Sequence, residues 1–352
     1  MALKKLNTLQ GGRGIAAMMV LLYHANGAYG FGDRHLLGHI FSFGFAGVDF
    51  FFVLSGFIIA YTSIPLFNTE NGVRIFIKKR FLRIYPIYWV YLLVAIIIGF
   101  FQYHDLNVFE NFWKTLIFFP EYHFVLRASW TLGFEVFFYF LFALFIFSRW
   151  SLVLIIPVAI FSVISAVLQN MGIYSLSYNP IINNSCTPFN IEFLFGFLSF
   201  YLYNKISKPV IWTLLTGVSL TMVLEIIYYQ RADYRELYQG MRILPFGLPA
   251  FAVVTAFAAL DFRGLFTTPK FLVILGDASY TLYLVHANIF SFVNDAIFIP
   301  LKLSEKTVMD LMIIVVVFAI VLSLLLYKYV EKPLLKKLNQ LWREKIEPTK
   351  AS

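Results

Sequence analysis

Charged residues and cysteines are scarce in this chain of 352 residues. Only 13% of the residues are charged, where a soluble domain has about a quarter, and Cys186 is the single cysteine. One cysteine excludes an internal disulfide and any metal site built from cysteines. The sequence also lacks zinc-site and EF-hand spacings, a Walker loop and a glycine-rich dinucleotide motif. We therefore expect no bound metal.

Hydrophobic and aromatic residues are abundant instead. They include 41 Phe and 21 Tyr, the chain is 60% hydrophobic, and its mean hydropathy is +0.76. Apolar runs of about 18 or more residues recur along the whole length, and they are continuous rather than alternating, which favours membrane-spanning helices. The sequence predicts an all-α, polytopic helical membrane protein with about ten transmembrane helices, at residues 12–30, 43–63, 84–102, 130–148, 151–168, 189–204, 209–229, 243–260, 275–299 and 307–328.

We expect one transmembrane domain, residues 1–330, followed by a tail of residues 331–352. The tail is short, basic and amphipathic, which is typical of a segment lying on the membrane surface. The N-terminus resembles a signal peptide, but Arg13 and His24 inside the apolar run predict a first helix that is retained. No internal repeat is visible, which weakly disfavours a transporter made of inverted repeats.

The distribution of Lys and Arg predicts the orientation. With the N-terminus in the cytoplasm, the inner segments hold 20 of the 28 Lys and Arg residues, and the outer segment 169–188 holds none. We therefore expect a protein of the inner (plasma) membrane with both termini in the cytoplasm. The net charge of +9 is then explained by the basic cytoplasmic segments and their contact with anionic lipid, and it does not indicate a nucleic-acid partner.

Arg13 and His24 are ionisable residues inside the first apolar segment. Eleven residues of helix turn through about 1100°, which is three turns plus roughly 20°, so both side chains share one face and lie about 16 Å apart along the axis. Ionisable residues at membrane depth are costly and are usually kept for function. His24 could be a structural hydrogen-bonding residue, but a neutral imidazole could also take a proton from a hydroxyl.

Two carboxylates also fall at membrane depth. Glu135 is surrounded by Phe and Leu and needs a partner or a proton, and Thr131, Phe138 and Tyr139 share its helical face. We favour a functional role for Glu135 over a structural ion pair. For Asp49 we favour a structural role, as the partner of His24 or of an arginine. Gly56, seven residues further, would let another helix come close.

The basic run 74–83 precedes the third apolar segment. Such runs usually contact anionic lipid and set the topology. Arg80 and Arg83 share a face if the run is helical, and Pro86 suits a helix start or a kink. Arginine grips phosphate oxygens in a bidentate way, so a phosphate-rich molecule could bind at this inner surface.

Ser279, Tyr283 and His286 fall on one helical face at positions i, i+4 and i+7. We expect hydrogen bonds between helices here, with catalysis as the less favoured alternative, because the sequence contains no nucleophile elbow. The other four histidines fall in predicted outer segments, where a solvated surface is the default interpretation: His35, His39, His104 and His123.

Taken together, these stretches resemble the membrane acyltransferase 3 family. The resemblance rests on six matches in order along nearly the full length: 9–17 with His24, 47–57, 80–86, 130–139, 275–286 and the closing Glu331-Lys332-Pro333. Three departures are visible. Gly12 replaces a large apolar residue, Thr131 replaces a serine, and the proline that usually follows the late histidine is missing.

The resemblance implies a stand-alone membrane O-acyltransferase. It would take an acyl group, usually acetyl, from acyl-CoA in the cytoplasm and pass it to a hydroxyl of a carbohydrate or another acceptor, such as cell-surface polysaccharide or its lipid-linked precursor. Some relatives carry an extracellular esterase-like domain that completes the transfer; with no such domain here, we expect this chain to finish the reaction itself or to hand over to a separate protein. The sequence leaves the acceptor, the acyl length and the oligomeric state open.

On this interpretation Arg80 and Arg83, with Arg13, hold the phosphates of acetyl-CoA. His24 acts as general base or acyl relay, and Glu135 orients or charges it. The rival class is a proton-coupled transporter or flippase that uses His24, Glu135 and Asp49 as a relay. A purely structural membrane protein would leave the buried charges unexplained.

The predicted orientation can be tested by cysteine accessibility. In a Cys186→Ser background, Asn184→Cys should react with a membrane-impermeant maleimide added outside intact cells, because residue 184 lies in a predicted outer segment. Lys208→Cys should react only after the cells are opened. The reverse pattern would overturn the orientation and, with it, the side on which the acyl donor binds.

Overall fold

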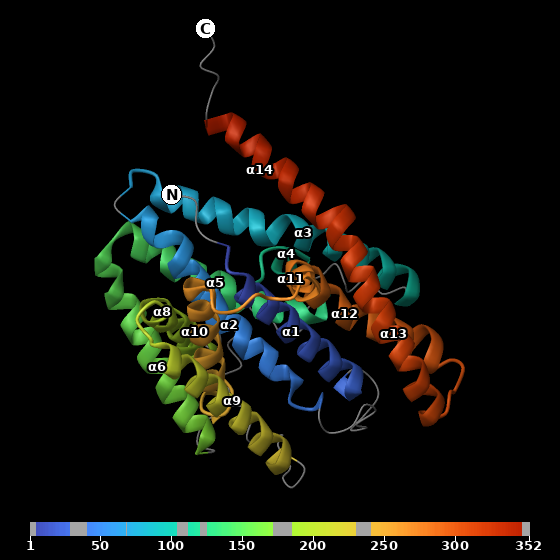
Figure 1. The fold of residues 1–352 in the computed structure, drawn as a ribbon. Helices are drawn as coiled ribbons and strands as arrows, with labels where there is room; N and C mark the ends of the chain where they lie inside the picture. Colours follow the sequence, from blue (N-terminus) through green and yellow to red (C-terminus); the bar gives the residue numbers. More distant parts are fainter. Residues whose placement is uncertain are drawn as a thin grey trace.

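The computed structural model describes residues 5–28, 41–67, 69–103, 112–119, 125–171, 185–229 and 241–346. Within these ranges the regular structure is helical and no strand occurs, which confirms the predicted all-α class. The main helices (Figure 1) are α1 (Asn7–Tyr23), α2 (Gly47–Ser63), α3 (Gly72–Tyr103), α4 (Phe112–Leu116), α5 (Trp130–Phe147), α6 (Leu152–Asn170), α8 (Phe189–Leu202), α9 (Lys208–Tyr229), α10 (Gly247–Arg263), α11 (Lys270–Asp277), α12 (Ser279–Val293), α13 (Glu305–Leu326) and α14 (Lys332–Ile346).

The outer surface of the bundle is apolar. Phe147 and Trp150 are 79% and 85% exposed, and large apolar side chains face outward along most of the long helices. Such a surface is stable only against lipid. Five helical stretches of the described chain are long and apolar enough to cross a membrane, and the expected number of ten stays a prediction; the five are Gly44–Leu66, Gly72–Gln102, Arg127–Phe147, Arg149–Leu168 and Glu305–Trp342.

Two of the predicted spans, 84–102 and 275–299, differ from the helices of the structure. The predicted span 84–102 is the second half of α3, which begins at Gly72 and continues through Pro86. Hydropathy marks only the apolar half, whereas the basic run before it consists largely of good helix formers. The predicted span 275–299 is divided at Ala278, where φ is −87° and ψ is −1°, into α11 and α12.

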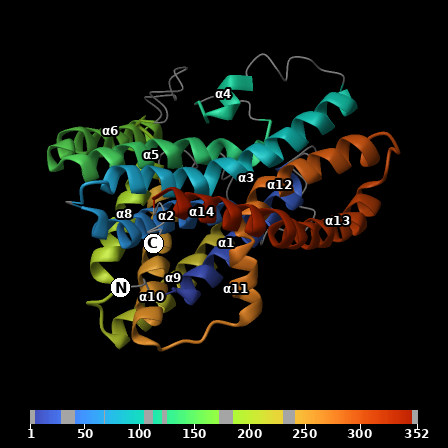
Figure 2. The same cartoon turned by 90° about the horizontal axis from the view of Figure 1, so that it is seen from above.

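Helices α1 and α2 form the centre of the bundle (Figures 1 and 2). α1 contacts α2, α10, α11 and α12, and α2 makes its most extensive contact with α8. A Cβ atom built on Gly56 of α2 would lie 2.1 Å from the carbonyl oxygen of Phe193, and one built on Gly196 of α8 would lie 2.1 Å from the carbonyl oxygen of Val53. The two backbones touch here, which confirms the predicted close approach at Gly56.

The first helix is anchored at its N-terminal end by two contacts. The Asp261 carboxylate at the end of α10 accepts hydrogen bonds from the backbone N–H of Thr8, at 2.8 and 3.0 Å, and of Leu9, at 3.2 Å. These are N–H groups that the helix itself cannot satisfy, and a carboxylate there also complements the helix dipole. A Cβ on Gly276 of α11 would lie 1.8 Å from the carbonyl oxygen of Gln10, so α11 lies directly against α1.

The glycine contact between α2 and α8 yields a matched test. Gly56→Ala should lower the melting temperature of the protein in detergent, because the added methyl group overlaps a backbone oxygen that cannot move alone. Gly217→Ala on α9 is the control, since a Cβ there meets nothing within 4 Å and Ala favours a helix by about 0.5–1 kcal/mol over Gly. Equal melting temperatures for the two variants would contradict the close packing.

Candidate active site

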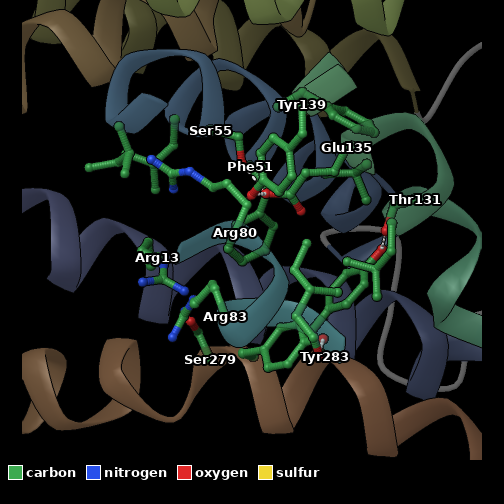
Figure 3. Close-up of a pocket in the computed structure, with 17 residues that line it drawn as sticks. Arg13, Phe51, Ser55, Arg80, Arg83, Thr131, Glu135, Tyr139, Ser279 and Tyr283 are labelled. Atoms are coloured by element: carbon green, nitrogen blue, oxygen red, sulfur yellow. Dashed lines mark hydrogen bonds between the residues drawn. The ribbon is translucent and has the colours of Figure 1, made fainter. Parts of the chain in front are cut away.

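A partly open cavity lies between α1, α2, α3, α5 and α12, with about 860 Å³ of empty space that includes open solvent. Figure 3 shows its two sides: the arginines gather on one wall, and a carboxylate and several hydroxyl groups lie on the other. Apolar side chains from α2, α3 and α5 complete the lining. The polar lining residues are Arg13, Ser55, Arg80, Arg83, Thr131, Glu135, Tyr139, Ser279, Tyr280 and Tyr283.

The arginine wall carries more positive charge than its described contacts neutralise. Arg13 donates from Nη1 to Gln10 Oε1 at 3.3 Å, and Arg80 donates from Nη2 to Thr62 Oγ1 at 2.5 Å; both acceptors are uncharged. The Nε of Arg80 is buried and has no hydrogen-bond partner within the described ranges. Guanidinium groups that share a cavity repel one another unless an anion lies between them. This wall is therefore suited to a multiply charged anion.

Arg83 is the member of this wall that has an acidic partner. Its Nη1 lies 3.7 Å from Oε1 of Glu331, a fully buried residue that also accepts a hydrogen bond from Thr281 Oγ1 at 2.6 Å. The guanidinium also lies over the ring of Tyr280, 5.5 Å from its centre. Glu331 is the first residue of the predicted tail; in the structure it ends the π-helical turn Tyr327–Glu331, and α14 begins at Lys332.

Glu135 lies on the opposite wall, on α5. Its Oε1 accepts a hydrogen bond from Ser55 Oγ at 3.1 Å and a short one from the hydroxyl of Tyr139. The ring of Tyr139 in turn lies 5.5 Å from the Arg80 guanidinium. Two donors fix the carboxylate at the cavity surface, where Oε2 makes no hydrogen bond to the described residues and can accept one from a ligand.

Thr131 and Tyr283 connect the cavity with a pair of histidines. The Thr131 and Tyr283 hydroxyls are 2.9 Å apart, and the Tyr283 ring centre lies 6.0 Å from that of His286. His286 Nε2 lies 2.7 Å from His24 Nδ1. His24 begins a short π-helical turn, His24–Ala28, at the end of α1. Glu135 is predicted to orient His24; in the structure the imidazole of His286 contacts His24, and Glu135 accepts hydrogen bonds from Ser55 and Tyr139.

Asp49 lies outside the cavity and forms an ion pair. Its two oxygens accept hydrogen bonds from Nε and Nη2 of Arg242, at 2.8 and 2.7 Å, so its partner is an arginine, the second of the two expected alternatives. Glu192, a fully buried residue on α8, lies beside this pair and interacts with both the Asp49 carboxyl group and Arg242. Sequence reasoning missed both Arg242 and Glu192; an acidic residue inside the short apolar segment 189–204 was the available signal.

The structure thus brings together most of the residues singled out in the sequence. Six line one cavity, two form the histidine pair next to it, and Asp49 is elsewhere. The four remaining histidines lie outside the described residues. In the described ranges no group of three or more His, Cys, Asp or Glu side chains is placed to hold a metal ion. The six cavity residues are Arg13, Arg80, Arg83, Glu135, Ser279 and Tyr283.

Comparison with known families decides the class of protein. The model of a family described as an acyltransferase domain matches residues 6–328, nearly the whole chain. The chain belongs to the acyltransferase 3 family. This acyltransferase is helical and membrane-bound, as its fold and its apolar surface require.

Three curated relatives show how far the similarity extends. The exopolysaccharide production protein ExoZ of Rhizobium meliloti is 30% identical over 85% of this chain and 92% of its own length. The O-acetyltransferase OatA of Staphylococcus aureus is 25% identical over 94% of this chain but only 57% of its own length. The acyltransferase MdmB of Streptomyces mycarofaciens is 34% identical over 27% of this chain and 24% of its own. No solved structure matches the chain.

The ion pair of Asp49 leads to a stability prediction. Asp49→Ala should lower the free energy of unfolding by about 3–5 kcal/mol, because Arg242 would lose its bidentate partner while remaining largely buried. Thermal unfolding in detergent measures the effect. Asp310→Ala, which removes an exposed carboxylate from α13, is the control and should be nearly neutral. An Asp49→Ala protein as stable as the control would exclude the structural role.

Proposed function

We propose that this protein is an acyl-CoA-dependent O-acyltransferase that moves an acyl group, acetyl in the first instance, to a hydroxyl of a cell-surface polysaccharide or its lipid-linked precursor. The observation that carries the proposal is the cavity, whose arginine wall is suited to phosphates and whose far side leads through Tyr283 to the histidine pair. Membership of the acyltransferase 3 family supports the reaction class.

Arg13, Arg80 and Arg83 hold the phosphates of the donor. Their guanidinium groups gather at one side of the cavity (Figure 3), and the buried Nε of Arg80 still has a hydrogen bond to give. Arginine–phosphate contacts are charge-assisted and often bidentate, which offsets the cost of removing the guanidinium groups from water. The run of Lys and Arg on α3 favours the cytoplasmic side for this end of the cavity, in a plasma-membrane protein with both termini inside.

His24 acts as the general base of the transfer. It takes the proton of the acceptor hydroxyl while that oxygen forms a bond to the thioester carbonyl carbon. The carbon–sulfur bond then breaks, and His24 returns the proton to the leaving sulfur, so the products are the O-acyl ester and the free thiol of CoA. Glu135 orients the substrate from the cavity wall by accepting a hydrogen bond with Oε2, since Ser55 and Tyr139 already occupy Oε1.

The printed names of two relatives support the acceptor class. ExoZ is named for exopolysaccharide production and OatA for O-acetyl transfer, and both match most of this chain. A carbohydrate hydroxyl is therefore the acceptor that we propose. The transporter alternative needs Asp49 in one relay with His24 and Glu135, whereas Asp49 lies outside the cavity and both of its oxygens accept hydrogen bonds from Arg242.

The donor site can be tested by removing its arginines. Arg80→Ala with Arg83→Ala should weaken acetyl-CoA binding by about 1.5–3 kcal/mol for each lost contact. The matched control is Arg74→Ala with Lys78→Ala, which removes the same charge from the same helix but from a different groove. Calorimetric titration of purified protein with acetyl-CoA measures the difference. Equal acetyl-CoA affinity in both double variants would show that Arg80 and Arg83 do not bind the donor and serve only to set the orientation in the membrane.

The chemistry is tested at His24. His24→Ala should lower acyl transfer by about 10²–10⁴-fold while leaving acetyl-CoA affinity unchanged, because a general base acts on the hydroxyl proton and not on the phosphates. The measurement is transfer of label from acetyl-CoA to the polysaccharide fraction of membrane vesicles with matched protein levels, with mass spectrometry of the surface polysaccharide for acetyl mass differences. A His24→Ala enzyme with normal turnover would contradict the proposed mechanism. A wild-type protein that never consumes acetyl-CoA would contradict the proposed function.

A further inference from the structure

His286 is held between two partners, the Leu282 carbonyl and His24. It is fully buried on α12, and its two ring nitrogens point in different directions. Nδ1 lies 2.9 Å from the carbonyl oxygen of Leu282, one turn earlier in the same helix. Nε2 lies 2.7 Å from Nδ1 of His24, which comes from a different part of the chain. The two contacts together determine where the protons are.

The first contact assigns the proton of His286. A carbonyl oxygen only accepts hydrogen bonds, so Nδ1 of His286 must be the donor and must carry the hydrogen. A neutral imidazole carries one N–H, which leaves Nε2 as an acceptor. A cationic His286 would instead place an uncompensated charge in a side chain with no exposed surface, and no carboxylate contacts its ring within the described ranges.

The second contact then assigns the proton of His24. Because Nε2 of His286 accepts, Nδ1 of His24 must donate, and the lone pair of neutral His24 is on its Nε2. The ring geometry agrees, since the planes are only 23° apart while the centroids are 5.0 Å apart and the nitrogens 2.7 Å apart. The rings therefore meet edge to edge, which directs the N–H of one ring at the lone pair of the other.

We infer that His286 is a positioning residue that fixes the tautomer of His24, so that Nε2 of His24 is the atom that takes the proton from the acceptor hydroxyl. This inference rests on the proposed acyltransferase function. An orienting hydrogen bond on the far nitrogen of a histidine base holds both the tautomer and the ring direction. Here a second histidine serves that purpose, with the Leu282 carbonyl behind it.

The same hydrogen bond serves both protonation states of His24. After Nε2 has taken the hydroxyl proton, Nδ1–H still donates to His286, so no group has to turn while the imidazolium exists. The acceptor on His286 stabilises that charge, and the proton leaves again from Nε2 to the sulfur of CoA. His286 itself neither gains nor loses a proton in the cycle, and the step balances with His24 alone.

Three substitutions at residue 286 separate hydrogen bonding from packing. In glutamine, the amide oxygen is as many bonds from Cβ as Nε2 of histidine, so His286→Gln keeps an acceptor for His24. In asparagine, the amide is as many bonds from Cβ as Nδ1, so His286→Asn keeps the contact to Leu282 but does not reach His24. His286→Phe keeps a ring without an acceptor. Label transfer from acetyl-CoA to polysaccharide in vesicles gives kcat and the KM for acetyl-CoA.

We expect kcat to fall at least about tenfold in His286→Asn and His286→Phe, with KM for acetyl-CoA unchanged. The loss should not exceed the roughly 10²–10⁴-fold loss that removal of the general base His24 itself would cause. His286→Gln should stay within about tenfold of the wild type, the range of one neutral hydrogen bond. Wild-type kcat in the Asn and Phe variants, or a Gln variant as inactive as the Asn variant at equal folded protein, would overturn the inference.

The outcomes also separate this inference from the proposed function. A wild-type protein without acetyl-CoA turnover overturns the function and the role of the pair with it. An active wild type with an inactive His24→Ala variant, but with normal His286→Asn and His286→Phe variants, leaves the function intact and overturns only the role of His286. An equal loss of acetyl-CoA affinity in all three His286 variants would show that the residue merely supports the fold of the cavity.

Discussion

Burial of charge among apolar helices is the constraint on which this structure depends. A charge out of water is tolerated only with a partner, and removing one partner of a buried pair costs about 3–5 kcal/mol. The buried carboxylates accordingly join segments that are distant in sequence. Asp261 caps the first helix through Thr8, and Asp49 binds Arg242. Polar contacts of this kind determine which helices are neighbours more specifically than apolar packing does, because apolar helix surfaces pack equally well against lipid.

In the arginine wall of the cavity, the buried positive charges are not all paired with carboxylates. Arg83 has a buried carboxylate, but Arg13 and Arg80 contact only uncharged acceptors among the described residues. A cavity with excess positive charge, a carboxylate held on the facing wall and a histidine pair beyond Tyr283 is organised along one direction. On the proposed function, the charge at one end would select an anionic donor and the imidazoles at the other end would supply the base, so that binding and chemistry would be separated along one path.

The sequence predicted what depends on neighbouring residues and missed what depends on tertiary contacts. Apolar run length predicted the helical membrane class, and spacing along a helix put Ser279, Tyr283 and His286 on one face. Tyr283 and His286 do contact other helices there, through Thr131 and His24, whereas the buried Ser279 hydroxyl has no hydrogen-bond partner among the described residues. The partner of His24 could not be read in this way, because His286 is far away in the sequence and the π-helical turn at His24 alters the simple helical register. The burial of Glu331 could not be predicted either, because the segment around it is basic and amphipathic, which indicates an exposed helix.

The most direct test is an experimental structure of the protein in lipid nanodiscs with a non-transferable acetyl-CoA analogue. The donor should lie in the cavity, with its phosphates on Arg13, Arg80 and Arg83 and its acyl end toward Tyr283, close enough to the histidine pair for His24 Nε2 to reach an acceptor hydroxyl. Phosphates bound instead in the groove of Arg74 and Lys78, or an acyl end on the far side of the arginine wall from His24, would contradict the proposed path.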